Sequence, residues 1–135
     1  INFIENIVKS KGGITFALED EESSRASIMM HLTSIAEQFD KLSKDGEFEI
    51  LSKFDKNDLK GSYDIRNYIV HDYEGLNLMI IEVVIREKLP KIKEVVLNIL
   101  RWNYFIKEGF FWKIYRVFIF CICFNELGFI GIKNG

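Results

Sequence analysis

Apolar residues recur at three- and four-residue steps along much of the chain, which is the spacing of amphipathic helices. The clearest such stretch follows the acidic cluster from Glu19 to Glu22 and contains Ala26, Met29, Leu32, Ile35, Ala36, Phe39 and Leu42. Ser23 and Ser24 stand directly before it, and serine is a preferred residue at helix N-termini. We therefore expect a long helix with a serine cap here.

A second helix is predicted from Tyr63 to about Asp72, and its apolar positions are Ile65, Ile69 and Val70. The polar stretch from Lys56 to Gly61 interrupts the pattern before this helix. One short helical turn is expected to begin near Asp55, and Gly75 is expected to break the pattern again.

Two more helical segments are predicted after Gly75. Asn77 can cap the first, which runs through Leu78, Ile81, Val84 and Ile85. Pro90 fits the first turn of its continuation, which runs through Ile92, Val95, Val96, Ile99 and Leu100. Together these segments predict an all-α fold, an antiparallel helical bundle.

Composition is that of a globular chain. The 135 residues are 48% hydrophobic, with one proline and nine glycines, so one compact domain is expected and a disordered or collagen-like chain is excluded. The formal net charge of −2 argues against a general cationic surface for long nucleic acid. Any contact with RNA is therefore expected to be local.

The end of the chain differs from the rest. Of the 19 Phe, Trp and Tyr residues, 11 follow Leu100, and residues 101–135 hold 5 basic and 2 acidic groups against 13 and 18 in residues 1–100. We therefore divide the chain into a helical domain, 1–100, and an aromatic C-terminal extension, 101–135. The segment from Phe110 to Phe124 is too apolar to lie free in water. It is interpreted as a further helix or arm over the bundle, a membrane-surface segment, or an altered reading-frame end.

Several classes of protein and site are not expected. Cys121 and Cys123 are one residue apart and cannot staple a fold, so a reducing compartment, the cytoplasm, is the expected location. With no second cysteine pair or nearby histidine they do not predict a zinc site, and no sequence motif indicates a cofactor or metal. The uncharged run from Val117 to Phe124 is far shorter than the ~20 residues of a membrane span, and no secretory signal is seen at the start.

Polar chemistry concentrates between Arg66 and Tyr73. In a helix, Asn67 and His71 are one turn apart on one face, and Arg66 and Tyr73 are two turns apart on a neighbouring face. A guanidinium can hold a phosphate at two points, and an imidazole can exchange a proton near neutral pH. This combination suits RNA cleavage without a metal: His71 moves a proton to or from the reacting oxygens while Arg66 stabilises charge on phosphorus.

A structural interpretation stands beside this one. Arg66 can pair with a carboxylate such as Asp64 or Asp72, and His71 can be a hydrogen-bonded residue at a helix end. Two weaker candidates are Glu37, which can reach a cleft or be a solvated surface glutamate, and His31, which is expected to be structural or on the surface.

The spacing Arg66-Asn67-x3-His71-x-Tyr73, set before Glu74-Gly75-Leu76-Asn77 and a long helix interrupted at Leu89-Pro90, resembles the HepT-like HEPN ribonuclease toxins. The segment Ile35-Ala36-Glu37 is similar to the second long helix of that family, and Leu89-Pro90-Lys91-Ile92-Lys93 to its final one. The resemblance covers about residues 1–100. A short first helix and the tail after Leu100 depart from the family pattern.

The resemblance implies an all-α HEPN bundle that forms a two-fold dimer and cleaves RNA in a shared cleft. Arg66 and His71 are then the catalytic pair, and Asn67 orients His71. The implied partner is a minimal nucleotidyltransferase antitoxin of a type VII-like toxin–antitoxin system, which neutralises the toxin by transferring AMP to Tyr73. The alternative is a catalytically silent HEPN module that binds such a nucleotidyltransferase.

Overall fold

The computed structural model describes the backbone of residues 1–73 and 75–106 and the side chains as far as Arg101, and no β-strand occurs in this part of the chain. The predicted all-α fold is confirmed. The elements, in chain order, are α1 (Asn2–Ser10), α2 (Ile14–Glu19), the π-helical turn η1 (Glu21–Arg25), α3 (Ala26–Lys44), α4 (Phe48–Leu51), α5 (Lys56–His71), α6 (Leu78–Val83), the π-helical turn η2 (Val84–Lys88) and α7 (Leu89–Ile106).

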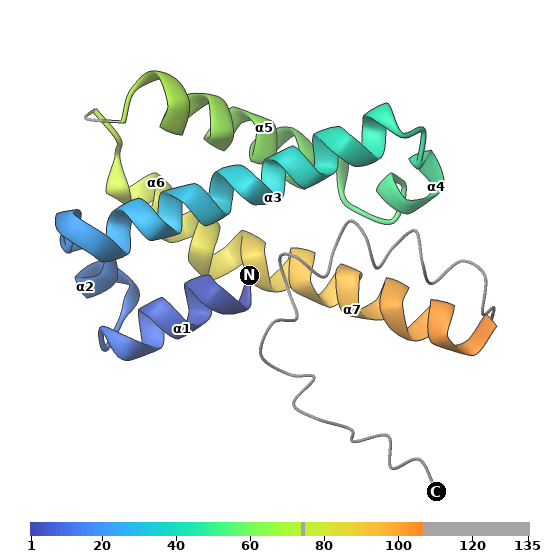
Figure 1. Ribbon diagram of the computed structural model, residues 1–135, viewed down its shortest axis with the longest axis horizontal. Coiled ribbons are helices and arrows are strands. Elements are labelled where there is room, and N and C mark those ends of the chain that lie inside the picture. Colours follow the sequence, from blue (N-terminus) through green and yellow to red (C-terminus); the bar gives the residue numbers. More distant parts are fainter. Residues whose placement is uncertain (74, 107–135) are drawn as a thin grey trace, which may run out of the picture.

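Helix α3 is the centre of the bundle (Figure 1). It packs against α5, which runs in the opposite direction, and α1 also packs against it. The segments α6, η2 and α7 follow one another without a break. In the view of Figure 1, α6 passes behind α3 and contacts α2, and α7 continues below α3. This arrangement leaves the C-terminal end of α5 and the connection to α6 at one end of the bundle.

The core is built mainly on the periodic apolar face of α3. Six of the seven residues that define the predicted face are buried, and only Ala26 is exposed. Phe39 is 1% exposed and meets the ring of Phe54 edge to face at 5.0 Å between centroids. The core cluster comprises Ile1, Ile4, Ala17, Leu18, Ile28, Met29, Leu32, Ile35, Phe39, Leu42, Ile50, Phe54, Ile69, Ile81, Ile85, Leu89, Ile92 and Val96.

The predicted serine cap is wrong, because Asp20 performs this function. Its carboxylate accepts hydrogen bonds from the Ser24 N–H at 3.3 Å and from the hydroxyls of Ser23 and Ser24 at 3.0 and 2.7 Å. Lys11 forms an ion pair with the same carboxylate at 2.7 Å. The Lys11 contact and these hydrogen bonds hold the pKa of Asp20 well below its usual range. A carboxylate is the stronger acceptor, so the serines become its donors.

Helix α5 begins earlier than predicted. The stretch from Lys56 to Gly61 is not an interruption but the start of this helix, which Asp55 caps by accepting the N–H groups of Asn57 and Asp58 at 2.8 and 3.2 Å. Asp58 also forms an ion pair with Lys88 at 2.7 Å. The cap and this long-range ion pair stabilise the first turns of α5, although the segment has no apolar periodicity of its own. A helical turn does begin near Asp55 as expected, but it is the first turn of α5 and not a separate short one. The short helix α4 was not predicted.

The two predictions for the segment after Gly75, the Asn77 cap and Pro90 in the first turn of a helix, are confirmed. Asn77 caps α6 by accepting the Met79 N–H at 3.0 Å, and Pro90 lies in the first turn of α7. Proline lacks an N–H, and the wide turn η2 ends two residues before Pro90. Helix α7 continues through the proposed domain boundary at Leu100 to Ile106.

The predictions for residues 110–124 and for Cys121 and Cys123 concern residues outside the described part of the chain. None of the helices that the structure describes is both long and apolar enough to cross a membrane.

Candidate functional site at the C-terminal end of α5

The last two turns of α5 carry three of the four motif residues. Arg66, Asn67 and His71 lie within the helix, and His71 is its final residue. Asp72 leaves the helical conformation at φ −144° and ψ 54°, so Tyr73 lies in the connection to α6. The prediction that Tyr73 extends a helical face with Arg66 is therefore wrong.

Burial follows from the helical period. Ile69 is buried in the core at 7% exposure, and at ~100° per residue Asn67 and His71 are carried close to the opposite side of α5, where both are exposed. Arg66 lies on the flank of the helix and is half-buried. Because Ile69 packs into the core, the polar side chains of Asn67 and His71 lie on the exposed side of α5.

The Arg66 guanidinium has no carboxylate partner among residues 1–73 and 75–101. Its hydrogen bond there runs from Nη1 to Oδ1 of the neighbouring Asn67, at 3.3 Å. Asp64 is exposed, and the Asp72 carboxylate instead accepts the Gly75 N–H at 3.2 Å. The ion pair of Arg66 with Asp64 or Asp72, which the sequence left open, is absent from this part of the chain. Within the described residues, one donor of the guanidinium is used, in the bond to Asn67.

His71 is exposed, and its imidazole has no hydrogen bond to any side chain or backbone group that the structure describes. Asn67 stands one turn before it, but the Asn67 amide oxygen is bonded to Arg66. The hydrogen-bonded helix-end histidine of the structural interpretation is thus not found here. That Asn67 orients His71 stays a prediction.

Local charge adds a second cation near Arg66. Lys44, at the end of α3, pairs with Asp40 at 2.5 Å. This contact raises the pKa of Lys44, and the Arg66 guanidinium opposes that shift, which places the two cations within electrostatic reach of each other. Lys44 is itself paired with Asp40, so the charge around Arg66 is mixed.

Three tyrosines have described side chains, and they differ in how their hydroxyls are engaged. Tyr63 is half-buried, and burial raises its pKa. The Tyr68 hydroxyl donates to the Gly75 carbonyl at 3.1 Å and accepts the Asn77 N–H at 2.8 Å. Tyr73 is 44% exposed, and its hydroxyl has no hydrogen bond within the described side chains. Tyr73 is thus the accessible hydroxyl of the three.

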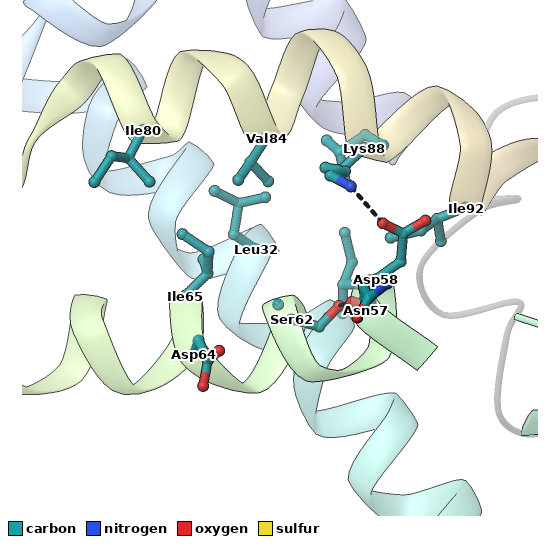
Figure 2. A pocket seen from close by; sticks show the side chains of 13 residues that line it. Leu32, Asn57, Asp58, Ser62, Asp64, Ile65, Ile80, Val84, Lys88 and Ile92 are labelled. Atoms are coloured by element: carbon teal, nitrogen blue, oxygen red, sulfur yellow. Dashed lines mark hydrogen bonds and ion pairs between the residues drawn. The ribbon is translucent and has the colours of Figure 1, made fainter. Parts of the chain in front are cut away.

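A cavity of about 210 Å³ lies elsewhere, between α3, α5 and the segment from α6 to α7 (Figure 2). Its wall is apolar apart from the polar side of α5 and the ion pair between Lys88 and Asp58, drawn as a dashed line in Figure 2. None of the four motif residues lines it. The predicted groove lined by these polar groups is thus not this cavity. The Asp58–Lys88 pair had no sequence signal, because the two residues are 30 positions apart.

The weaker candidates do not join the motif. His31 stacks on Phe3 with ring centroids 5.1 Å apart, and burial lowers its pKa, as fits a structural histidine. Glu37 is exposed on α3 and forms no ion pair with a described residue. Among the side chains that the structure describes, no three His, Cys, Asp or Glu residues gather as a metal site.

The family model described as "Ribonuclease HepT-like" matches residues 1–99. No curated protein and no solved structure matches the chain. The matched range contains the whole bundle from α1 to η2, most of α7 and the four motif residues, and the all-α architecture agrees with an HEPN-type bundle. The chain therefore belongs to the HepT-like ribonuclease family.

Proposed function

We propose that this protein is a metal-independent RNA endonuclease, the toxin of a type VII-like toxin–antitoxin system, with Arg66 and His71 as its catalytic pair and Asn67 as the residue that orients His71. The family supports RNA as the substrate class. The observation that carries the proposal is the Arg66 guanidinium without a carboxylate partner among the described residues, on the same exposed end of α5 as the His71 imidazole. A cation left unpaired on a protein surface is suited to an anionic ligand.

The proposed chemistry uses the ribose as its own nucleophile. A neutral His71 imidazole accepts the proton of the 2′-hydroxyl, and the 2′-oxygen forms a bond to phosphorus. The bond from phosphorus to the 5′-oxygen breaks, and an imidazolium returns a proton to that oxygen. Arg66 stabilises the extra negative charge on the phosphorane oxygens. The products are a 2′,3′-cyclic phosphate and a 5′-hydroxyl.

Helical geometry supports a two-fold dimer. Five residues at ~100° each separate Arg66 and His71 by roughly 140° around α5, so one protomer presents the two groups in different directions. A second copy related by two-fold symmetry would place its His71 opposite Arg66 in a shared cleft. Exposed apolar side chains are available to bury in such an interface: Val70, Met79, Ile80 and Val83 are 56%, 75%, 45% and 47% exposed.

Tyr73 is the proposed control point. A minimal nucleotidyltransferase antitoxin would transfer AMP from ATP: the Tyr73 phenolic oxygen bonds to the α-phosphorus, pyrophosphate leaves, and the phenolic proton is released. The exposure of Tyr73 and its free hydroxyl within the described part support this choice. The adduct would carry a phosphate anion next to the site, where it competes with RNA for Arg66.

Replacing either member of the catalytic pair is expected to remove activity without unfolding the protein. His71→Ala and Arg66→Ala should each lower RNA cleavage by about 10² to 10⁴, the usual worth of a general acid–base or charge-stabilising group, because neither side chain lies in the core. Far-UV circular dichroism should be unchanged, and EDTA should not slow the wild type. Arg86→Ala, which removes an exposed arginine paired with Glu82 on α6, is the matched control.

Full cleavage by either folded variant would assign the chemistry to other residues, and dependence on an added divalent metal would contradict the mechanism. A wild type that binds the nucleotidyltransferase but never cleaves RNA would indicate the silent binding module instead.

The dimer is expected to depend on the apolar side chains beside the motif. Val70→Asp should shift the mass measured by light scattering from dimer to monomer and lower RNA cleavage with it, because a charge buried in an apolar interface is costly. Phe48→Asp, at an exposed phenylalanine on α4, should leave both unchanged. A wild type that is monomeric at micromolar concentration with full cleavage would overturn the shared cleft.

Modification is expected at one tyrosine. Incubation with the cognate nucleotidyltransferase and ATP should add AMP at Tyr73, as mapped by mass spectrometry, and should inhibit cleavage. Tyr73→Phe should resist the modification while it retains at least part of its cleavage activity, since its hydroxyl moves no proton in the proposed reaction. AMP mapped to Tyr63, Tyr68, Tyr104 or Tyr115, or to no tyrosine, would show that Tyr73 is not the acceptor.

A further inference from the structure

The connection between α5 and α6 is held by one side chain that the motif leaves unspecified. This connection runs from Asp72 to Asn77 and carries Tyr73. Tyr68 lies on α5, at the first of the three positions between Asn67 and His71. Its backbone carbonyl accepts the Asp72 N–H at 3.0 Å, and its hydroxyl reaches across the connection to the residues that precede α6.

The Tyr68 hydroxyl uses both its donor and its acceptor capacity in this contact. It donates to the Gly75 carbonyl at 3.1 Å and accepts the Asn77 N–H at 2.8 Å. A phenol has one hydrogen to donate, so the hydroxyl is committed. Asn77 is also the N-cap of α6, which means that the contact joins the start of α6 to the last turns of α5.

A hydrogen bond between Asp72 and Gly75 also stabilises this connection. The Gly75 N–H donates to the Asp72 carboxylate at 3.2 Å. A Cβ at position 75 would stand 2.5 Å from both oxygens of that carboxylate, so an alanine there would displace the Asp72 side chain. Tyr73 therefore lies between two residues that are held by hydrogen bonds. Asp72 is hydrogen-bonded to Tyr68, and Gly75 is hydrogen-bonded to both Tyr68 and Asp72.

We propose that Tyr68 is a positioning residue for Tyr73, and that its hydroxyl holds the connection so that the Tyr73 phenolic oxygen is presented to the nucleotidyltransferase. This inference rests on the proposed AMP transfer to Tyr73. The transfer requires the phenolic oxygen to meet the α-phosphorus of ATP as pyrophosphate leaves, and a small displacement of an attacking atom can cost a large factor in rate. Tyr68 itself is a poor acceptor, because its modification would break the bond that its hydroxyl donates to Gly75.

The test compares Tyr68→Phe with the wild type and with Tyr63→Phe as the matched control. Tyr68→Phe keeps the ring and removes both hydroxyl contacts. Hydrogen exchange should show the Asn77 amide at least about tenfold less protected in this variant and unchanged in Tyr63→Phe, since that amide has lost its acceptor. This first readout needs neither RNA nor a partner.

The second readout is the steady-state rate of AMP transfer from ATP by the cognate nucleotidyltransferase, mapped to residue 73. Tyr68→Phe should lower kcat by about tenfold to a hundredfold with KM for the toxin changed less than twofold, because the docking surface stays while the acceptor oxygen is misplaced. Gly75→Ala, which displaces the Asp72 carboxylate, should lower kcat in the same way.

The outcomes separate the two proposals. Transfer to Tyr73 at the wild-type kcat in Tyr68→Phe, with the Asn77 amide deprotected, would overturn the positioning role alone. A rise in KM with unchanged kcat would also overturn it, because Tyr68 would then act in docking. No transfer to Tyr73 in the wild type would overturn the proposed modification and this inference with it.

Discussion

The packing of α5 against α3 is the constraint on which the site depends. Ile69 is buried, Ile65 packs against the core, and Asp55 fixes where α5 begins. Once that face is committed to the core, the helical period leaves Asn67, Val70 and His71 on the outside and Arg66 on the flank. Any change that rotates or slides α5 against α3 would therefore displace all the proposed chemistry together.

The end of α5 is as important as its face. Because the helix stops at His71, Tyr73 belongs to a connection that has its own hydrogen bonds to Tyr68 and Asp72. Residues 66–73 therefore carry two proposed functions. Helical positions hold the groups proposed to cleave RNA, and the hydrogen-bonded connection holds the Tyr73 hydroxyl that is proposed to control cleavage.

Much of this architecture could be predicted from the sequence. The buried face of α3, the Asn77 cap and the place of Pro90 are local signals, and the structure confirms them. Two expectations failed because a longer-range or competing interaction decided the outcome. Asp20 replaced the serine cap since a carboxylate with a Lys11 partner is the stronger acceptor, and α5 began at Lys56 since Asp55 and the distant Lys88 satisfy its polar start.

The sequence names the segment that carries the candidate site but does not predict the geometry of that segment. The motif spacing named Arg66, Asn67, His71 and Tyr73, and the helix ends near Asp72 as expected, yet the spacing could not reveal that Tyr73 leaves the helical face or that Tyr68 bridges to Asn77. The position of Tyr73 depends on the backbone conformation of Asp72. The contact between Tyr68 and Asn77 joins positions nine apart across a turn, and it depends on the direction of the Tyr68 side chain and not on sequence spacing.

The central claim is that this surface cleaves RNA through the ribose 2′-hydroxyl, with Arg66 and His71 supplying charge and proton transfer. The most direct measurement is the analysis of product ends after incubation of the wild type with an RNA oligonucleotide and with its 2′-deoxy counterpart, both in EDTA. The account predicts cleavage of the RNA alone, with 2′,3′-cyclic phosphate and 5′-hydroxyl ends. Cleavage of the deoxy strand, or 5′-phosphate ends on the RNA, would contradict it, because water and not the ribose would then be the nucleophile.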